Sequence, residues 1–381
     1  MLKCGIVGLP LCGKSTVFNV ITRAGVEVKP YAGGKTEPNR ALVNVPDSRF
    51  DILTDIFEPK KTTPAVVEFV DLAGLSRDAS KGAGLGNSFL GFVSESEALL
   101  HVIRVFENPD VPHPENSLDP LRDWQIVETE LIYRDLGVIE NRLTRLAGKK
   151  KTPSAGQKNP DADEIELLKK LQEHLLEERP LREAELTDEQ KKTLAGFAFL
   201  TLKPELVVLN LDEKQTGALP QAEALEKLLK EKGLLSVRLF GSLEMDLAQL
   251  EPTEQAEFMK DLSIDKLGRD RLIHEAYRML GRISFFTTGK DEVRAWTLSE
   301  GDSALAAAGA IHSDLARGFI RAQVAAYDDF IEFYRQGNYA PGDPKAGDAV
   351  MTALRGKGLL RLEGKEYRVK DGDMIEIRFN V

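Results

Sequence analysis

One short segment near the start of the sequence constrains the fold more than any other. Residues 8–15 read Gly-Leu-Pro-Leu-Cys-Gly-Lys-Ser, which fits the pattern G-x-x-x-x-G-K-[ST]. The preceding residues 3–7 have the apolar character of a buried strand, and residues 16–24 have the pattern of a helix. In that order, the loop amides and the start of the helix converge on one anion. The sequence therefore predicts a phosphate-binding strand, loop and helix of the P-loop class.

Individual residues of this unit have expected roles. Lys14 should reach the β- and γ-phosphates and assist catalysis there, and the hydroxyl of Ser15 should be a ligand of Mg²⁺. Asp71 follows the apolar run Val66–Val70 and should hold Mg²⁺ through water, while the N–H of Gly74 should sense the γ-phosphate. The residues expected to bind nucleotide in and beside the loop are Gly8, Leu11, Cys12, Gly13, Lys14, Ser15 and Thr16.

A second motif bears on which base is bound. Residues 210–213 read Asn-Leu-Asp-Glu and follow the apolar run Leu206–Leu209, where GTPases carry N-K-x-D. The last Asp of that motif accepts hydrogen bonds from two guanine N–H groups, and adenine has an acceptor where guanine has a donor. Because Leu211 replaces the Lys and the longer Glu213 replaces the Asp, the sequence favours ATP. The residues expected to contact the base are Asn210, Leu211, Glu213 and Ser242.

The pattern of apolar runs predicts the fold class. Near-continuous apolar strands alternate with helical patterns such as Lys14–Ala24 and Leu219–Lys232, which indicates an α/β domain with a mainly parallel sheet. The expected strands are Leu2–Gly8, Ala41–Val45, Val66–Asp71, Leu99–Phe106, Leu206–Asn210 and Leu235–Phe240.

The gap between the fourth and fifth of these strands has a different pattern. Ile126–Ala147 and Ile165–Leu176 carry apolar residues at helical spacing, with a polar, turn-forming break between them. They predict an inserted antiparallel α-helical hairpin, and Thr187 with Gln190 predicts a capping box at the start of a third helix.

From about Arg282 the pattern changes to short strands and turns, which indicates a separate α+β domain. The strands expected there are Ile283–Thr287, Val293–Thr297, Tyr367–Lys370 and Met374–Phe379. The predicted division is residues 1–124 with 202–281 for the nucleotide-binding domain, 125–201 for the hairpin, and 282–381 for the last domain.

Composition limits the function classes. No apolar run approaches the ~20 residues that span a membrane, so we expect no membrane association. The net charge of −10 does not indicate general nucleic-acid binding, although residues 355–370 form a local basic patch. The cysteines are Cys4 and Cys12, too few for a disulfide framework, which favours a reducing compartment such as the cytoplasm.

These motifs together carry a family resemblance. The chain resembles the Obg-like ATPases, the YchF family of P-loop proteins in the translation-factor class, along its whole length. The segments that carry the resemblance are KCGIVGLP…GKST, EFVDLAGL, KGAGLGN, HVIRVFEN, FLTLKP before NLDE, EVRAW, IHSDLARGFIRAQ and VKDGDMIEIRFNV. The resemblance implies a Ras-like core, a helical hairpin insert and a C-terminal ubiquitin-like domain of the TGS type. It also implies ATP in preference to GTP, and association with ribosomes; we expect a chain that is mostly monomeric.

The resemblance also bears on catalysis. Ras-like GTPases place a Gln after D-x-x-G to orient the attacking water, and here Leu75 stands in that place. The resemblance implies a histidine in a mobile loop after HVIRVFEN, and His113 stands there. A histidine can handle a proton or a water molecule near neutral pH, so His113 is the expected catalytic residue, with an ordinary surface histidine as the alternative.

The sequence departs from the family pattern at two places in the loop. Leu11 stands where the family has an Asn that would help to coordinate a monovalent cation, so stimulation by potassium is in doubt. Cys12 lies beside the helix start and Lys14, where a thiol could have a lowered pKa and be oxidisable. A small residue that fills a backbone turn is the alternative interpretation of Cys12, and the one we favour.

The first switch segment also departs from the family. The family has a Thr two residues before E-P-N, and here Lys35 occupies that place while Thr36 lies one residue nearer to Glu37. Thr36 is the expected Mg²⁺ ligand, and Lys35 meeting the γ-phosphate is the alternative.

The main hypothesis is an ATP-hydrolysing switch whose nucleotide state orders residues 31–39 and 74–92. Two alternatives remain open on the sequence. One is a GTPase with a degenerate base motif. The other is a ribosome- or RNA-binding module that holds nucleotide as a ligand with little hydrolysis and uses residues 355–370 as its contact surface.

Overall fold

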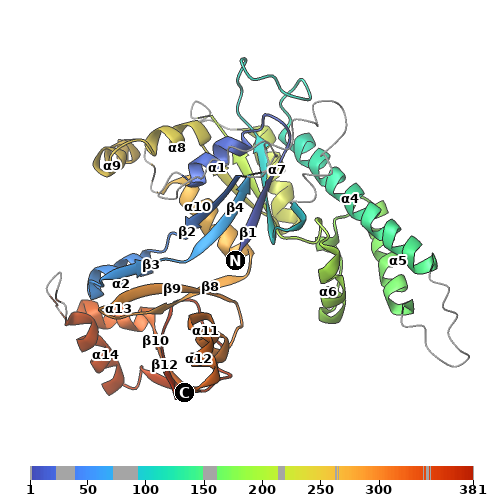
Figure 1. Cartoon of the computed structure of the whole chain (residues 1–381). Helices are drawn as coiled ribbons and strands as arrows, with labels where there is room; N and C mark the ends of the chain where they lie inside the picture. Colours follow the sequence, from blue (N-terminus) through green and yellow to red (C-terminus); the bar gives the residue numbers. More distant parts are fainter. Residues whose placement is uncertain are drawn as a thin grey trace, which may run out of the picture. The chain divides into compact units, whose positions relative to one another are not determined.

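The structure is a computed structural model, and it describes residues 2–22, 39–71, 93–148, 161–212, 219–261, 264, 266–337, 339, 343 and 345–380. The chain forms two compact units, Met1–Val43 with Glu68–Ala276, and Asn44–Val67 with Tyr277–Val381. Within the described ranges, no helix combines the length and apolar character needed to cross a membrane. The predicted α/β nucleotide-binding fold with a second α+β domain is confirmed (Figure 1).

The first unit is built on a six-stranded sheet with the strand order β2-β4-β1-β5-β6-β7. The strands are β1 (Lys3–Val7), β2 (Asn39–Asn44), β4 (Val66–Asp71), β5 (Ala98–Arg104), β6 (Glu205–Asn210) and β7 (Leu235–Leu239). Strand β1 pairs in parallel with β4 and β5, and the pairs β5–β6 and β6–β7 are parallel too. All residues of β5 and β6 are buried, which explains their near-continuous apolar sequence.

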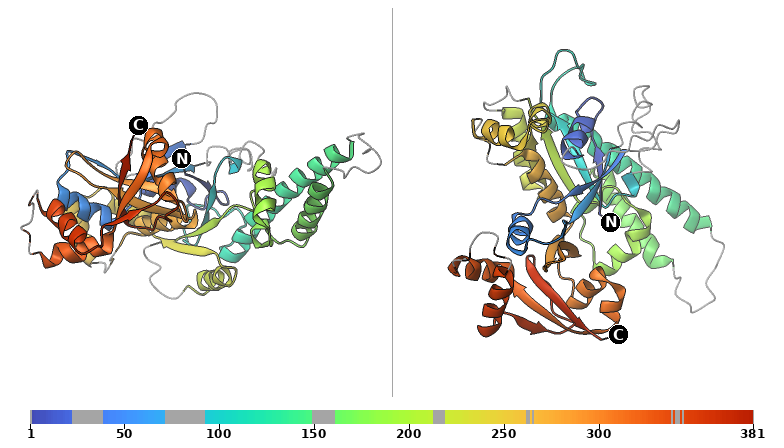
Figure 2. Two further views of the ribbon diagram at one scale, coloured as in Figure 1. Left: turned by 90° about the horizontal axis from the view of Figure 1, so that it is seen from below. Right: turned by 60° about the vertical axis from the view of Figure 1, so that its left-hand side comes forward.

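The parallel register brings the carboxyl ends of the strands to one edge of the sheet. Ile6 pairs with Asp71, and Asn210 pairs with both Arg104 and Leu239. In open α/β sheets, ligands bind outside this edge. The remaining helices of the core are α1 (Lys14–Thr22), α7 (Pro220–Glu231), α8 (Gly241–Leu247), α9 (Pro252–Asp261) and α10 (Gly268–Met279), and further views are given in Figure 2.

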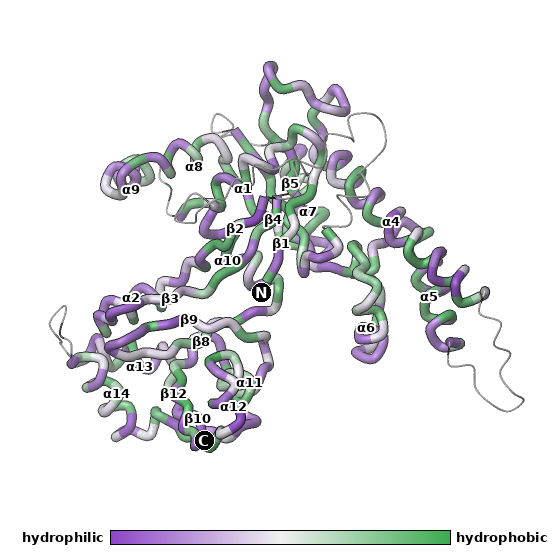
Figure 3. The backbone as a smooth tube through the Cα atoms, in the orientation of Figure 1, coloured by the Kyte–Doolittle hydropathy of each residue, from purple (hydrophilic) through white to green (hydrophobic). Residues whose placement is uncertain are grey.

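The insert is an antiparallel pair of helices. Helices α4 (Pro120–Gly148) and α5 (Ala162–Leu176) pack through a shared apolar cluster that includes Ile139, Leu168 and Leu171. Figure 3 shows hydrophobic and hydrophilic residues alternating along both helices, as expected for two amphipathic helices that bury one face. They are followed by η2 (Leu181–Glu183), α6 (Asp188–Leu194) and η3 (Ala195–Phe197). The predicted capping box of Thr187 and Gln190 is confirmed at the start of α6.

The second unit has its own six-stranded sheet, with the order β11-β10-β12-β8-β9-β3. Its strands are β3 (Lys61–Thr63), β8 (Arg282–Thr287), β9 (Glu292–Ser299), β10 (Phe319–Ala326), β11 (Arg361–Glu363) and β12 (Asp373–Phe379). Its helices are α2 (Ser48–Phe57), α11 (Ala304–Ile311), α12 (Ser313–Arg317), α13 (Tyr327–Gln336) and α14 (Ala346–Gly356). A buried cluster that includes Phe285, Ala307 and Val324 joins the sheet to α11.

Two expectations for this unit differ from the structure. Tyr367–Lys370 is not a strand: Arg368 makes an isolated bridge to Ser303, and the N–H of Val369 donates to Asp302 O (3.0 Å) in a turn-rich segment. The sequence predicts residues 44–67 in the nucleotide-binding domain, but in the structure they group with the C-terminal residues, where β3 pairs in parallel with β9.

Candidate functional site

The loop between β1 and α1 has the backbone of a phosphate-binding turn. Gly8 and Gly13 have backbone φ values of 146° and 97°, which residues with a side chain rarely adopt. A Cβ at Gly8 would lie 2.4 Å from Val102 O, and one at Gly13 would lie 2.1 Å from Asn210 Nδ2. Glycine is therefore required at both ends of the loop, by conformation and by the closeness of the strands behind it.

Lys14 is the first residue of α1, and its side chain folds back over the loop. The residue is 5% exposed, and its Nζ donates to Gly8 O (3.0 Å) and Leu9 O (2.8 Å). These two hydrogen bonds hold the ammonium group inside the loop, at the positive end of the helix. The loop therefore has its cation in place before any anion arrives.

Two oxygen-bearing side chains meet beside this lysine. The hydroxyl of Ser15 donates to Asp71 Oδ2 (3.1 Å), and Asp71 is 1% exposed at the end of β4. Carboxylate and hydroxyl oxygens are the ligand types that Mg²⁺ takes in proteins, so this pair fits the expected metal position. Thr36, the expected third ligand, and Gly74 lie outside the described residues, as do Lys35 and Leu75.

Strand β6, which precedes the expected base-binding motif, is hydrogen-bonded to the phosphate loop. Asn210 is 3% exposed, and its Nδ2 donates to Cys12 O (3.1 Å). A Cβ at Gly241 would lie 2.7 Å from Asn210 Oδ1 and 3.1 Å from Thr16 Cγ2, so these groups share one crowded corner. Asn210 therefore couples the position of the loop to the carboxyl end of β6.

The other predicted base contacts have different surroundings. Leu211 is 3% exposed within an apolar cluster, and its N–H donates to Leu239 O (2.8 Å), so its side chain belongs to the core. Ser242 is exposed in the first turn of α8, directly after Gly241. Glu213 lies outside the described residues.

The loop residues that depart from the family pattern also have clear positions. Cys12 is 2% exposed, and burial raises the pKa of its thiol, which the nearby Lys14 lowers only in part. Burial therefore outweighs the helix start and the lysine, which argues against a low-pKa thiol and supports the favoured interpretation of Cys12 as a small residue that fills the turn. Leu11 is 52% exposed with φ 62°, a left-handed conformation that Asn adopts more readily than Leu.

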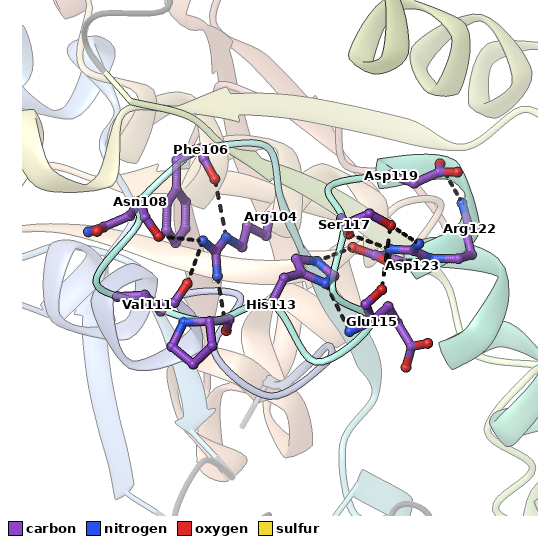
Figure 4. A network of polar contacts seen from close by, with 11 residues as sticks. Arg104, Phe106, Asn108, Val111, His113, Glu115, Ser117, Asp119, Arg122 and Asp123 are labelled. Atoms are coloured by element: carbon purple, nitrogen blue, oxygen red, sulfur yellow. Dashed lines mark hydrogen bonds and ion pairs between the residues drawn. The ribbon is translucent and has the colours of Figure 1, made fainter.

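His113 lies in the segment between β5 and α4, and both of its ring nitrogens are engaged (Figure 4). Its Nε2 is 2.8 Å from Asp123 Oδ2, and its Nδ1 accepts the backbone N–H of Glu115 (3.1 Å). Asp123 is in turn bound through Oδ1 by Nε (3.1 Å) and Nη2 (2.7 Å) of Arg122. His113 is thus half of a histidine–carboxylate pair rather than an unattached surface residue.

Arg104 organises the first half of the same segment. It ends β5, is 4% exposed, and lies over the ring of Phe106 with 4.4 Å from its Cζ to the ring centroid. Its guanidinium donates to the carbonyl oxygens of Phe106 (3.1 Å), Val111 (2.9 Å), Asn108 (3.4 Å) and Pro112 (3.5 Å). Arg104, Arg122 and Asp123 were missed by sequence reasoning, although a charged residue near the end of a largely apolar run is a signal that could have found Arg104.

Comparisons with known proteins point to one family and cover the whole chain. Residues 3–133 match the family model described as "50S ribosome-binding GTPase", and residues 282–380 match the model YchF-GTPase_C, described as "Protein of unknown function (DUF933)". The "Ribosome-binding ATPase YchF" of Haemophilus ducreyi is 40% identical over 379 residues, covering 100% of this chain and 99% of that protein. The chain belongs to the YchF family. The Bacillus subtilis member is also 40% identical, over 384 residues, with 100% of both chains covered.

A solved structure of the YchF family supports the same assignment. The "Schizosaccharomyces pombe YchF GTPase" has a TM-score of 0.84 and 30% sequence identity, and the match covers 99% of this chain and 97% of that one. The resemblance inferred from the sequence motifs is thereby confirmed.

This YchF chain has a second polar cluster, formed by residues of β5, β6, α4 and η2. His101, Glu128 and Glu205 are buried, and one ligand atom from each lies within 4.8 Å of the others, a spacing that could hold a metal ion. However, Nη1 and Nη2 of Arg182 donate to both oxygens of Glu128 (2.9 Å each), and Nη2 also donates to Glu205 Oε2 (2.6 Å). Trp124 Nε1 (3.1 Å) and His101 Nδ1 (2.8 Å) contact Glu205 Oε1.

Since the guanidinium already supplies the positive charge that a metal would bring, we interpret this cluster as a structural ion-pair network between the sheet and the insert.

Burial and the neighbouring Glu205 raise the pKa of Glu128 to about 8. For Glu205, burial is opposed by Arg182 and by the His101 hydrogen bond, and its pKa is lowered to about 2. Of these two neighbouring carboxyl groups, Glu128 is therefore the one that holds a proton more readily, and Glu205 is the one that ionises more readily.

The network predicts a pH dependence of stability. Because the folded state raises the pKa of Glu128, it binds a proton more tightly than the unfolded chain, so stability contributed by this group is full below the ordinary pKa of 4.5 and is lost as the pH rises toward 8. Between pH 5 and pH 9, the free energy of unfolding of the wild type should fall by ~2–4 kcal/mol relative to Glu128→Gln. Urea titrations of both proteins across this range would measure the difference, and parallel curves would contradict the assignment of the proton.

Proposed function

We propose that this chain binds ATP with Mg²⁺ at residues 8–16 and hydrolyses it. The single observation that carries the proposal is the ammonium group of Lys14, which is held inside a loop whose backbone already has the conformation for binding phosphates. The 40%-identical relatives from Haemophilus ducreyi and Bacillus subtilis are named ATPases, which supports the same reaction.

In the proposed mechanism, different groups bind the phosphates, hold Mg²⁺ and orient the attacking water. The loop amides and Lys14 bind and orient the β- and γ-phosphates, with Ser15 and Asp71 as the residues that hold Mg²⁺ together with Thr36. When bound, Mg²⁺ supplies positive charge that offsets the charge on the phosphate oxygens. We assign the γ-phosphate contact from the switch to the N–H of Gly74. With Leu75 in the usual Gln place, we assign the orientation of the attacking water to His113, because an imidazole can hydrogen-bond and position a water molecule.

Base choice is the part of this proposal that a simple experiment tests. We propose that Asn210, Leu211, Glu213 and Ser242 form a site that prefers adenine, with Asn210 acting through its bond to Cys12 O and Leu211 acting by packing. The names of relatives differ here, since the Schizosaccharomyces pombe structure is named a GTPase.

Competition with a fluorescent ATP analogue should show ATP displacing the probe at a concentration at least ~10-fold lower than GTP, because one mismatched hydrogen-bonding edge costs about 1–3 kcal/mol. Glu213→Asp, which shortens the side chain to the length found in N-K-x-D, should narrow that gap. Equal displacement by the two nucleotides would favour the GTPase alternative. Displacement by both without turnover, with or without ribosomes, would favour the binding-module alternative.

We further propose that the partner is the ribosome and that the chain acts in the cytoplasm, mostly as a monomer. The bacterial relatives are named ribosome-binding. In this chain, the basic side chains that are exposed between 355 and 370 could contact RNA phosphates. They are Arg355, Lys357, Lys365, Arg368 and Lys370. The proposed nucleotide-dependent switch segments, 31–39 and 74–92, lie outside the described residues apart from Asn39.

A further inference from the structure

The hydrogen bonds of His113 fix the protonation of its ring. A backbone N–H can only donate, so the bond from Glu115 N (3.1 Å) makes Nδ1 an unprotonated acceptor. The proton of the neutral ring is therefore on Nε2, which donates to Asp123 Oδ2 at 2.8 Å. Both nitrogens are used, so in this conformation neither of them can accept a proton from water or donate one to it.

Asp123, which accepts the hydrogen bond from His113, is itself fixed by its surroundings. Its side chain is 3% exposed, and it lies in the first turn of α4, where the helix start favours a negative charge. Arg122 holds the other carboxylate oxygen through two N–H groups. The bond to His113 is consequently charge-assisted, of the stronger class of hydrogen bond.

The rest of the segment is held mainly by polar contacts at its two ends. Arg104 binds carbonyl oxygens in the first half, and Arg122 binds Ser117 O and Oγ (2.7 Å each) in the second half. Between these anchors, residues 107–110 and 114–117 are exposed. These exposed stretches bury little apolar surface, so they can change conformation at small free-energy cost once an anchoring contact is released.

We propose that Asp123 is a positioning residue that holds His113 in an inactive conformation until nucleotide and partner are bound. The proposal rests on the catalytic role proposed for His113. A histidine–carboxylate pair that served catalysis directly would leave the second nitrogen open to the substrate, whereas here the N–H of Glu115 occupies it. Turnover then requires the Asp123–His113 bond to break, and the fraction of molecules in which it is broken limits the basal rate.

The test is turnover of Mg²⁺-ATP by Asp123→Asn, with and without ribosomes. Asn keeps an acceptor for Nε2–H but removes the negative charge, so the contact weakens and the released fraction should rise by roughly 10-fold. We expect basal kcat to rise by about that factor with KM for ATP unchanged, and stimulation by ribosomes to shrink in proportion. His113→Ala should lower kcat, and Asp123→Asn should not raise it in that background.

Two further variants keep the test decisive. Arg122→Gln loosens the anchor without changing Asp123 and should raise basal kcat in the same direction, which covers the case in which Asp123→Asn does not fold. Asp314→Asn is the matched control, because it removes the carboxylate beside the exposed His312 of the C-terminal unit and should leave kcat as in the wild type. A fall in kcat for Asp123→Asn, matching that of His113→Ala, would overturn the proposal and make the pair a catalytic dyad.

A spectroscopic readout separates this proposal from the proposed function. In ¹⁵N-histidine NMR spectra of the nucleotide-free protein, His113 should show the tautomer protonated on Nε2, and Asp123→Asn should shift its Nε2 resonance. Addition of Mg²⁺ with the β,γ-imido analogue of ATP and ribosomal particles should broaden or move that signal. An unchanged kcat in His113→Ala would reject its catalytic role alone, whereas a ring protonated on Nδ1, or a signal indifferent to Asp123, would reject the inference itself.

Discussion

Lys14→Ala should weaken magnesium-dependent ATP binding by roughly 100- to 1,000-fold, or about 3–4 kcal/mol. Lys14 is 5% exposed, and hydrogen bonds to two main-chain oxygens of the loop hold its ammonium group in place. A charge that is fixed before binding loses little side-chain entropy when the phosphates arrive. Titration calorimetry with Mg²⁺-ATP would measure the loss directly.

Lys3→Ala is the matched control for this experiment. Lys3 begins β1, the strand that leads into the loop, and its Nζ lies 3.9 Å from Glu95 Oε2. Its removal therefore changes the net charge by the same amount without touching the loop. Its affinity for ATP should match that of the wild type. If Lys14→Ala binds ATP as tightly as Lys3→Ala, the loop does not have the role that its geometry indicates, and the proposed function fails with it.

The parts of the fold that could be predicted from sequence are those fixed by local chemistry. The glycine positions of the phosphate loop, the apolar strands of the parallel sheet and the Thr187–Gln190 capping box each depend on residues within a few positions of one another. The contact between Ser15 and Asp71 was predictable too, because the ends of parallel strands meet at one edge of the sheet.

The parts that could not be predicted depend on distant contacts. Strand β3 is short and polar, and it joins the second sheet only by pairing with β9, far along the chain. The pKa of Cys12 depends on burial, which the sequence does not display, so the helix start and Lys14 alone could not give the direction of its shift. The hydrogen bond between His113 and Asp123 forms together with the one from the backbone N–H of Glu115. No sequence motif encodes that turn.

The largest loss of stability is expected for Arg182→Met. The guanidinium lies between the carboxylates of Glu128 and Glu205, whose side chains are 7% and 0% exposed. Removing it leaves the ionised Glu205 buried beside a second carboxyl group, which should lower the free energy of unfolding by ~3–5 kcal/mol. Urea denaturation followed by circular dichroism would measure this loss.

The comparison that identifies burial as the cause uses a second arginine of the helical insert. Arg142 makes a similar two-pronged contact with Glu164, at 2.7 and 2.9 Å, but its side chain is 37% exposed, so Arg142→Met should cost less than about 1 kcal/mol. Adding Glu128→Met to Arg182→Met should recover part of the loss, because the remaining Glu205 keeps its contacts with His101 and Trp124. If the two arginine variants lose equal stability, helix packing rather than the buried charges joins the insert to the sheet.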